Sequence, residues 1–244
     1  GALTFAVAAS APGYDEEAGG CSRQELRELA LRGIRYLCFT HDTGPPDCVR
    51  PAKGLGRPET WGNKWGERGR GYFPESQCGL NVSNLAMAAL LLGDMVDDET
   101  WAMLVAMHQD YADRFGAMQP KTGVYTNTQM EENGWTSVGL ASVECLLSQS
   151  PDVQKWAATA RRWMFCTATA QQDTKNQALF DEGKTVAAWT ERLFTALPDY
   201  MAENHGMVHP SYTASSVNFL GNLGIVYGLH GKRAPKQAFF NRQI

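Results

Sequence analysis

The chain has 244 residues, 43% of them hydrophobic, which is enough to bury one sizeable core. Charged residues make up 20% and the formal net charge is −4, so the basic excess typical of nucleic-acid binders is absent and we expect no nucleic-acid partner. No run of eighteen apolar residues occurs, so we expect no transmembrane helix and no membrane partner. The apolar segment 2–11 lacks the basic region of a signal peptide and predicts a core helix or strand.

Hydrophobic residues recur at helical spacing along most of the chain, with little strand signal. The clearest helix begins at Ser22, which forms an S-x-x-E capping box with Glu25. Another begins at Ser150-Pro151, an N-cap followed by a proline at the first helical position. The pattern predicts helices over about 22–41, 80–92, 98–115, 131–147, 150–164, 185–197 and 214–229.

Helices in this succession favour antiparallel pairs, so we predict an all-α fold, an (α/α) toroid of helix pairs forming one domain over residues 1–244. A complete six-pair toroid needs about twelve helices of roughly 12–15 residues, which exceeds the length of this chain. The toroid is therefore expected to be incomplete or to belong to a longer chain. Toroids often dimerise, so a homodimer is an open alternative.

One long irregular segment, residues 42–78, is rich in glycine, proline, tryptophan and arginine. Long loops inside a compact domain are uncommon and are often functional. Aromatic faces stack on sugar rings and arginine forks bind carboxylates, so this segment fits an acidic sugar. The alternative is a loop that packs its own aromatic residues and pairs its arginines with Glu59, Glu67 and Glu75. The substrate-contact candidates in this segment are Trp61, Trp65, Arg68 and Arg70.

The six cysteines show no pair with the C-x-x-C spacing of a structural zinc site. Cys38 and Cys145 fall on apolar helix faces, which is typical of buried thiols. Cys48 and Cys78 lie toward the two ends of the irregular segment, where a disulfide between them is an open alternative. Such a bond would indicate an oxidising compartment, secreted or periplasmic, and the sequence leaves the location open.

The densest group of titratable residues lies at 198–212, PDYMAENHGMVHPSY, between two predicted helices. Two of the five histidines are there, and histidine is the side chain best suited to proton transfer near neutral pH. Histidines at i, i+4 can also bind a metal, but Pro210 argues against a continuous helix and the HEXXH pattern is absent, so we expect no metal. The catalytic candidates are Glu203, Asn204, His205, His209 and Tyr212.

A second cluster, residues 122–135, places Glu131 and Glu132 at the start of a predicted helix. Glutamates are favourable at the positive end of a helix, so a structural role is the alternative to a catalytic one. Tyr125 and Trp135 join this cluster as candidate substrate contacts. No P-loop, Rossmann glycine pattern or G-x-S-x-G elbow occurs, and we expect no cofactor.

The stretch Glu203-Asn204-His205-Gly206, followed by His209-Pro210-Ser211-Tyr212, resembles the heparinase II/III-like group of (α/α)-toroid proteins. The stretch Glu131-Glu132-Asn133-Gly134-Trp135 before an apolar helix adds to the likeness, which covers roughly residues 120–240. Typical members carry a β-rich domain after the toroid, and nothing in this sequence resembles one.

This resemblance implies an acidic glycan as substrate and cleavage of a uronic-acid glycoside by β-elimination. Asn204 would bind the substrate carboxylate and so make the C5 proton more acidic. Either His205 or Tyr212 would remove that proton, and Tyr212 would protonate the leaving oxygen. In the group the catalytic tyrosine usually lies much further along the chain, so His209 is the alternative acid or base.

Two other functions remain open on the same architecture. A glycoside hydrolase needs two carboxyl groups across the scissile bond, which Glu131 or Glu132 and Glu203 or Asp199 would supply. A non-catalytic glycan-binding protein would carry aromatic platforms without an acid-base pair. The geometry discriminates between them: facing carboxylates favour a hydrolase, and an Asn-His pair with a tyrosine favours a lyase.

Overall fold

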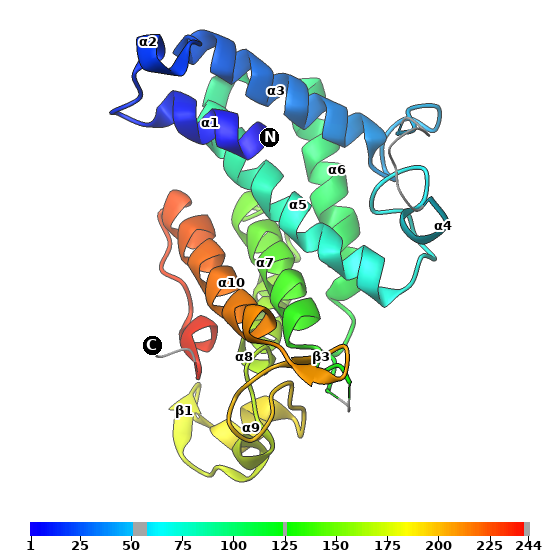
Figure 1. Ribbon diagram of the computed structural model, residues 1–244, viewed down its shortest axis with the longest axis vertical. Coiled ribbons are helices and arrows are strands. Elements are labelled where there is room, and N and C mark those ends of the chain that lie inside the picture. The colour runs from blue at the N-terminus through cyan, green and yellow to red at the C-terminus, as the bar shows by residue number, and fades with distance from the viewer. Residues whose placement is uncertain (51–57, 124–125, 242–244) are drawn as a thin grey trace. The chain divides into compact units, whose positions relative to one another are not determined.

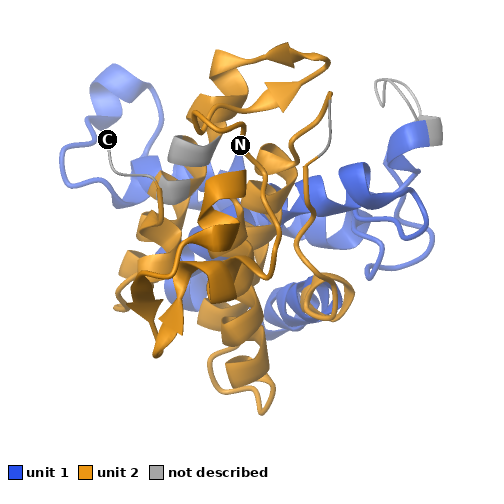
Figure 2. Ribbon diagram, turned by 90° about the horizontal axis from the view of Figure 1, so that it is seen from below, with its two compact units in different colours: residues 1–111 blue, residues 112–244 orange. Residues whose placement is uncertain are grey.

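The computed structural model describes residues 1–50, 58–123 and 126–241. The chain is mostly helical, with 60% of its residues in helices and 6% in strands, which confirms the expected helical class. It divides into two compact units, Gly1–Tyr111 and Ala112–Ile244, coloured separately in Figure 2. Each unit has its own buried core. The expectation of one domain over the whole chain stays a prediction.

The first unit is built on three helices that pack on one another, α1 (Ala2–Ser10), α3 (Arg23–Thr40) and α5 (Tyr72–Leu92) (Figure 1). The capping box of Ser22 and Glu25 starts α3 as predicted, and α3 buries one side of each turn against α1 and α5. The unit also contains most of the 18-residue helix α6 (Asp98–Phe115) and three short elements: α2 (Glu16–Gly19), α4 (Pro58–Trp61) and the 3-10 helix η1 (Gly93–Met95).

Helix α5 begins at Tyr72, eight residues before the start that the sequence pattern predicted. Pro74 lies in its first turn, where a missing backbone N–H leaves no helical hydrogen bond unmade. The Glu75 carboxylate accepts the backbone N–H groups of Arg70 (3.0 Å) and Gly71 (3.2 Å) at the same end. The irregular segment therefore ends at Gly71, and Cys78 is a buried helical residue.

Within the described residues, one helical stretch, Tyr72–Met95, is long and apolar enough to cross a membrane by length and composition alone. The sequence count of consecutive apolar residues had not singled it out. In its most apolar part, 56% is buried inside the chain, and the core helices of globular proteins pass the same test. The stretch therefore gives little reason to place the chain in a membrane, and the absence of a membrane partner stays a prediction.

Arg23, the first residue of α3, holds the end of α1 in place. Its guanidinium donates hydrogen bonds to four backbone carbonyls, those of Ala9 (2.9 Å), Ala11 (2.6 Å), Pro12 (3.3 Å) and Tyr14 (3.0 Å). The last carbonyls of a helix have no partner within the helix, and a cation is favourable there. One side chain thus satisfies the end of α1 and fixes its connection to α3.

Replacing Arg23 with alanine should lower the free energy of unfolding by about 1–3 kcal/mol, because hydrogen bonds from a charged donor to several carbonyls are lost together. Chemical denaturation of the full chain measures the change. Arg32→Ala is the matched control, since Arg32 is exposed on the same helix and lies 3.9 Å from Glu28. An equal loss in both variants would contradict the role given to Arg23.

The second unit is organised around α7 (Met130–Leu146), which packs against α8 (Val153–Cys166) and α10 (Pro210–Leu229) (Figure 1). Helix α7 is buried on almost every side, which explains why residues 134–143 of its sequence are all apolar or small. The remaining elements are short: η2 (Gln171–Lys175), β1 (Leu179–Asp181), β2 (Lys184–Thr185), α9 (Val186–Thr190), β3 (Glu203–Asn204), β4 (Met207–Val208) and η3 (Lys236–Phe239).

Two short antiparallel hairpins depart from the helical expectation. Strands β1 and β2 pair, as do β3 and β4, where Glu203 lies opposite Val208 and Asn204 opposite Met207. Helix α9 covers only the start of the helix predicted over 185–197. Helix α10 starts at Pro210, four residues earlier than predicted, because proline is well suited to the first helical position.

Helices α7 and α10 approach closely where Gly134 faces Phe219. A Cβ atom built on Gly134 would lie 2.2 Å from Cδ2 of the Phe219 ring. Trp135 also packs edge-on against that ring, with 6.5 Å between ring centroids. The missing side chain at Gly134 is therefore what admits Phe219 between the helices.

Replacing Gly134 with alanine should lower the free energy of unfolding by about 1–3 kcal/mol, since the added methyl group overpacks the interface. Gly221→Ala is the matched control, because nothing lies within 4 Å of a Cβ atom at that position in α10. The control should leave the free energy of unfolding unchanged or raise it by up to about 1 kcal/mol, because alanine is more favourable than glycine in a helix. Thermal or chemical unfolding would refute this packing argument if both variants gained stability.

All six cysteines lie in the described residues, and the structure joins none of them by a disulfide. The open alternative of a bond between Cys48 and Cys78 is therefore not realised. Cys78 is buried, and its thiol donates to the Pro74 carbonyl (3.4 Å), as expected one turn along a helix. Burial raises the pKa of the Cys38 and Cys145 thiols to about 12, in line with the inert buried thiols expected there.

Candidate functional site

The two sequence clusters of the second unit meet in the structure. Asn127, just before α7, forms an antiparallel bridge with Asn204 in β3. The backbone N–H of Thr128 donates to the Glu203 carbonyl (2.8 Å), and the Thr126 carbonyl accepts from Gly206 (3.3 Å). Residues about 75 apart in the chain are thus paired through their backbones, which places the starts of α7 and α10 at the same site.

His205 sits at the tip of the β3–β4 hairpin in a left-handed conformation. Its φ is 55° and that of Gly206 is 76°, the pattern of a two-residue turn that normally takes Asn-Gly. Thr126 (φ 79°) and Gln129 (φ 64°) in the paired segment also have positive φ. Such conformations are unfavourable for residues with side chains and concentrate at functional sites. The unfavourable backbone conformations and the titratable residues therefore both indicate a functional site at this position.

A histidine and a tyrosine are hydrogen-bonded at the centre of this site. Nε2 of His205 lies 3.2 Å from the hydroxyl oxygen of Tyr212. Pro210 begins α10 and puts Tyr212 in its first turn, where it packs against the buried cluster of Met130, Ala170, Ala196 and Ala202. The His209 ring packs edge-on against Tyr212 at 4.5 Å between centroids, and its Nδ1 lies 2.7 Å from the Ser211 hydroxyl. His209 therefore supports the tyrosine ring.

Glu131 and Glu132, in the first turn of α7, have different surroundings. Burial, with a smaller contribution from the charge of Glu132, raises the pKa of Glu131 to about 7. Glu132 is only 3% exposed, and its Oε1 accepts a hydrogen bond from the Asn127 side-chain amide (3.0 Å). Its Oε2 is buried and has no hydrogen-bond partner within the described part of the chain. An unsatisfied buried carboxylate oxygen is unusual in a purely structural cap.

These carboxylates also act on Tyr212. Burial raises the pKa of its hydroxyl, and the charges of Glu131 and Glu132 raise it further. A tyrosine in this environment stays protonated near neutral pH, so its hydroxyl is available to donate a hydrogen bond. The ionisable groups therefore separate into a tyrosine donor, a carboxyl group that titrates near neutral pH, and a histidine in contact with the tyrosine.

Asn204 and Glu203 are half-buried in β3 and belong to the same site. The Asn204 side-chain oxygen accepts the backbone N–H of His205 (2.8 Å), and a Glu203 carboxylate oxygen accepts that of Thr126 (3.2 Å). Beside them is a cavity of about 310 Å³, the size of a small ligand site. Its lining is Gly123, Thr128, Gln171, Phe194, Ala196, Leu197, Pro198 and Glu203.

Three other candidates from the two sequence clusters do not join His205, Tyr212 and the glutamates in the described structure. Trp135 is 4% exposed and packs on Phe219, so the expectation that it contacts substrate is wrong and its role is in the core. Asp199 accepts the backbone N–H of Met201 (3.1 Å) in a local turn. Tyr125 lies outside the described residues.

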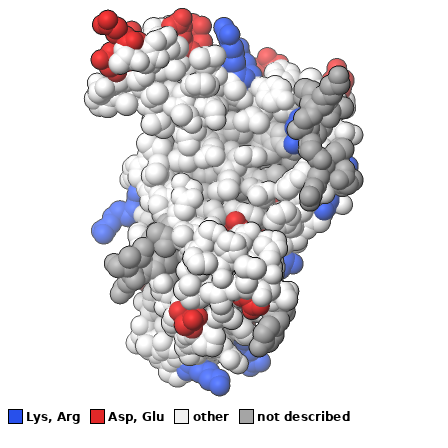
Figure 3. All heavy atoms as spheres, in the orientation of Figure 1, with Lys and Arg blue, Asp and Glu red and all other residues white. Residues whose placement is uncertain are grey.

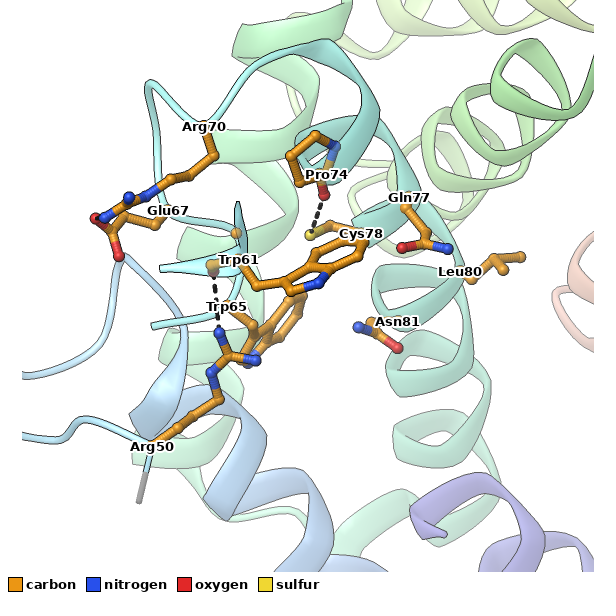
Figure 4. A pocket seen from close by; sticks show the side chains of 11 residues that line it. Arg50, Trp61, Trp65, Glu67, Arg70, Pro74, Gln77, Cys78, Leu80 and Asn81 are labelled. Atoms are coloured by element: carbon orange, nitrogen blue, oxygen red, sulfur yellow. Dashed lines mark hydrogen bonds and ion pairs between the residues drawn. The ribbon is translucent and has the colours of Figure 1, made fainter. Parts of the chain in front are cut away.

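The basic aromatic segment belongs to the first unit, and most of its charges have internal partners. Arg68 forms an ion pair with Asp110, and Arg70 forms one with Glu67. Trp65 is 5% exposed, and its indole N–H donates to the Leu37 carbonyl (2.7 Å). Arg68, Arg70 and Trp65 therefore have the internal partners of the structural alternative, while Trp65 and Arg70 also line a cavity, and the expectation that these residues contact a substrate stays a prediction. Trp61 is half-buried and lines a cavity (Figure 4).

The surface in Figure 3 shows no collected basic patch on the face it presents. Lysine and arginine atoms occur there as scattered groups, and acidic atoms gather at the end where α2 lies. This agrees with the small net charge of the sequence.

Asn127 belongs to this site, whereas the sequence placed it in the second cluster without making it a catalytic or substrate-contact candidate. Its side chain accepts the backbone N–H of Gln129 (2.8 Å) and donates to Glu132. Its backbone pairing with Asn204 is what identifies it as part of the site. A sequence pattern around Asn127 cannot show this pairing, because Asn204 is distant in the chain. No group of three potential metal ligands lies together within the described residues. Comparison with protein-family models, curated proteins and solved structures finds no match to this chain.

Replacing Glu131 with glutamine should change how stability depends on pH. A carboxyl group whose pKa rises on folding from 4.5 to about 7 costs stability as pH rises through that interval. The free energy of unfolding should fall by on the order of 1 kcal/mol between these pH values and then level off, the burial being only partial. Glu131→Gln should flatten that fall, as measured by chemical denaturation at successive pH values.

Glu99→Gln is the matched control, because Glu99 is exposed in the first turn of α6. It should leave the pH dependence of stability above pH 5 as in the parent chain, because the substitution removes a carboxylate at the surface of the other unit and leaves the surroundings of Glu131 unchanged. If the free energy of unfolding of the parent chain does not fall as pH rises from 4.5 to 7, folding does not raise the pKa of Glu131 and this prediction is wrong.

Proposed function

We propose that the chain cleaves a uronic-acid-containing poly- or oligosaccharide by β-elimination at the site formed by the starts of α7 and α10. The observation that carries this proposal is the hydrogen-bonded pair of His205 and Tyr212, set beside Glu131, whose pKa is about 7. Elimination needs a base for the C5 proton and an acid for the leaving oxygen within a short distance of each other. The Asn-His pair with a tyrosine is the arrangement that favours a lyase over a binding protein.

In the proposed reaction, His205 takes the C5 proton, a double bond forms between C4 and C5, and the C4–O bond breaks. Tyr212 gives its proton to the departing oxygen, so the products are an unsaturated uronate and a free hydroxyl. The raised pKa of Tyr212 supports the donor role rather than that of the base. The hydrogen bond between the two side chains then returns the proton from His205 to Tyr212, which restores both groups.

The substrate carboxylate must be offset before the C5 proton can leave, because negative charge moves onto it during abstraction. The Asn204 amide has its oxygen bound to a backbone N–H, which leaves its NH2 group as the donor toward an anion. Glu131 in its protonated form would add a second donor. Of the candidate catalytic residues, Glu203 alone lines the cavity of about 310 Å³, whose volume has room for one sugar ring.

A glycoside hydrolase is the second candidate, and Glu131 is the observation that favours it. A carboxyl group with a pKa of about 7 is suited to protonate a glycosidic oxygen, while a second, ionised carboxylate acts on the opposite side. Glu203 would be that second group. The position of His205 against Tyr212 has no part in this mechanism, which is why we place it second.

We propose that the helix pairs belong to an (α/α) toroid. The adjacent helices α7 and α8 are joined by only six residues, 147–152, and short connections are typical of antiparallel neighbours. An experimental structure that places both units would test this proposal. A toroid requires their helix pairs to surround one common axis.

The lyase proposal predicts an increase in ultraviolet absorbance when the full chain is incubated with uronic-acid polysaccharides. The new double bond is conjugated to the carboxylate and absorbs, whereas hydrolysis forms no such bond. His205→Ala and Tyr212→Phe should each lower the rate by at least about a hundredfold, the usual contribution of a positioned acid or base.

Tyr36→Phe is the control, because Tyr36 is exposed on α3 in the other unit, and it should keep the parent rate. New reducing ends without the absorbance, lost in Glu131→Gln, would replace the lyase by the hydrolase. A chain that binds these polysaccharides but releases neither product would be the glycan-binding protein left open by the sequence.

A further inference from the structure

A second cavity lies in the first unit, between the irregular segment and α5 (Figure 4). Its volume is about 430 Å³, within the usual range for small-molecule sites. Trp61, Arg50, Gln77 and Asn81 are among the residues that line it. None of these residues takes part in the reaction proposed for the second unit.

Trp61 supplies a flat apolar surface in this cavity. It ends the short helix α4 and is half-buried, and its ring is tilted at 52° to that of Phe73, with 5.8 Å between centroids. Figure 4 shows the indole extending across the cavity toward α5. An aromatic side chain supported on one side and open on another can accept the apolar face of a sugar ring.

Gln77 and Asn81 supply the polar contacts. They lie four residues apart in α5, so they share one face of the helix, and Figure 4 shows both amides on the side of the Trp61 ring. Neither amide has a hydrogen-bond partner within the described part of the protein. Each amide offers a donor and an acceptor, which is what a pair of neighbouring hydroxyl groups requires.

Arg50 holds the backbone of Trp61 in place and gives the cavity a positive charge. Its guanidinium donates to the backbone carbonyls of Trp61 (3.0 Å) and Gly62 (2.8 Å), while its Nε is buried and has no partner among the described residues. Arg70, on the other side of the cavity, is neutralised by Glu67. The charged residues of the lining therefore leave one positive charge, that of Arg50, without a carboxylate.

We propose that this cavity binds a single pyranose ring, stacked on Trp61 with its hydroxyl groups on Gln77 and Asn81. Because the charge of Arg50 is not balanced, a ring that carries a carboxylate should bind more tightly than its neutral counterpart. This site goes beyond the proposed reaction and does not depend on it.

The test measures binding of methyl β-D-glucuronide and methyl β-D-glucoside to the full chain by ligand-observed NMR and calorimetry. Both should bind, the glucuronide more tightly. Trp61→Ala should weaken binding of both at least about tenfold, and Gln77→Ala combined with Asn81→Ala should weaken it similarly. Trp101→Ala is the matched control, since Trp101 is an exposed tryptophan of α6 outside the cavity, and its affinity should equal that of the parent chain.

Binding of neither glycoside by the parent chain would overturn the proposal, as would unchanged affinity in the Gln77 and Asn81 double variant. That variant alters side chains at the helix surface, so it should fold even where Trp61→Ala does not. Equal affinity for the two glycosides would overturn the part assigned to Arg50. His205→Ala should bind both as the parent chain does, so loss of the proposed lyase activity and loss of this site are separate results.

Discussion

The contact between Gly134 and Phe219 is the constraint on which the candidate site depends. Gly134 lies one turn after Glu131 on α7, and Phe219 lies two turns after Tyr212 on α10. Because no side chain separates the helices at Gly134, their first turns are held close together. Tyr212 then packs against the buried cluster that includes Met130, and the charges of both glutamates raise the pKa of its hydroxyl. Packing of the core thus fixes the positions of the titratable groups, as a rigid scaffold does for a site.

The same packing determines the charge states. Burial at the start of α7 is the main cause of the raised pKa of Glu131, and burial also dominates for Tyr212. Glu132 is buried more deeply, yet one of its oxygens is held by Asn127. Two neighbouring glutamates of one helical turn are therefore held in different surroundings, and the pKa of Glu131 is raised to about 7 by its own.

The helices could be predicted where their signals are local. The capping box of α3 and the periodicity of α7 each lie within a few residues, and the structure contains these helices close to their predicted limits. Helix α8 is also present, but its predicted start at Ser150-Pro151 is wrong, because Pro151 lies in the preceding turn, Asp152 is the N-cap and the helix begins at Val153. The β3–β4 hairpin could not be predicted, because its strands have two residues each and its pairing with residues 126–128 joins distant segments. The clusters around Glu131 and His205 were identified by composition, but their meeting depends on that pairing.

The basic residues of the irregular segment show a second limit of prediction from sequence. A sequence shows where a cation is but not which group it binds. Lys64 is only 8% exposed, and its ammonium group donates to the carbonyls of Phe39, Gly44 and Pro45 at the end of α3. Arg50 binds the carbonyls of Trp61 and Gly62 in the same manner. These cations replace the backbone hydrogen bonds that a segment without regular structure cannot make for itself. A glycine-rich chain fixed in this way can hold one tryptophan at a cavity wall without a sheet or long helix beneath it.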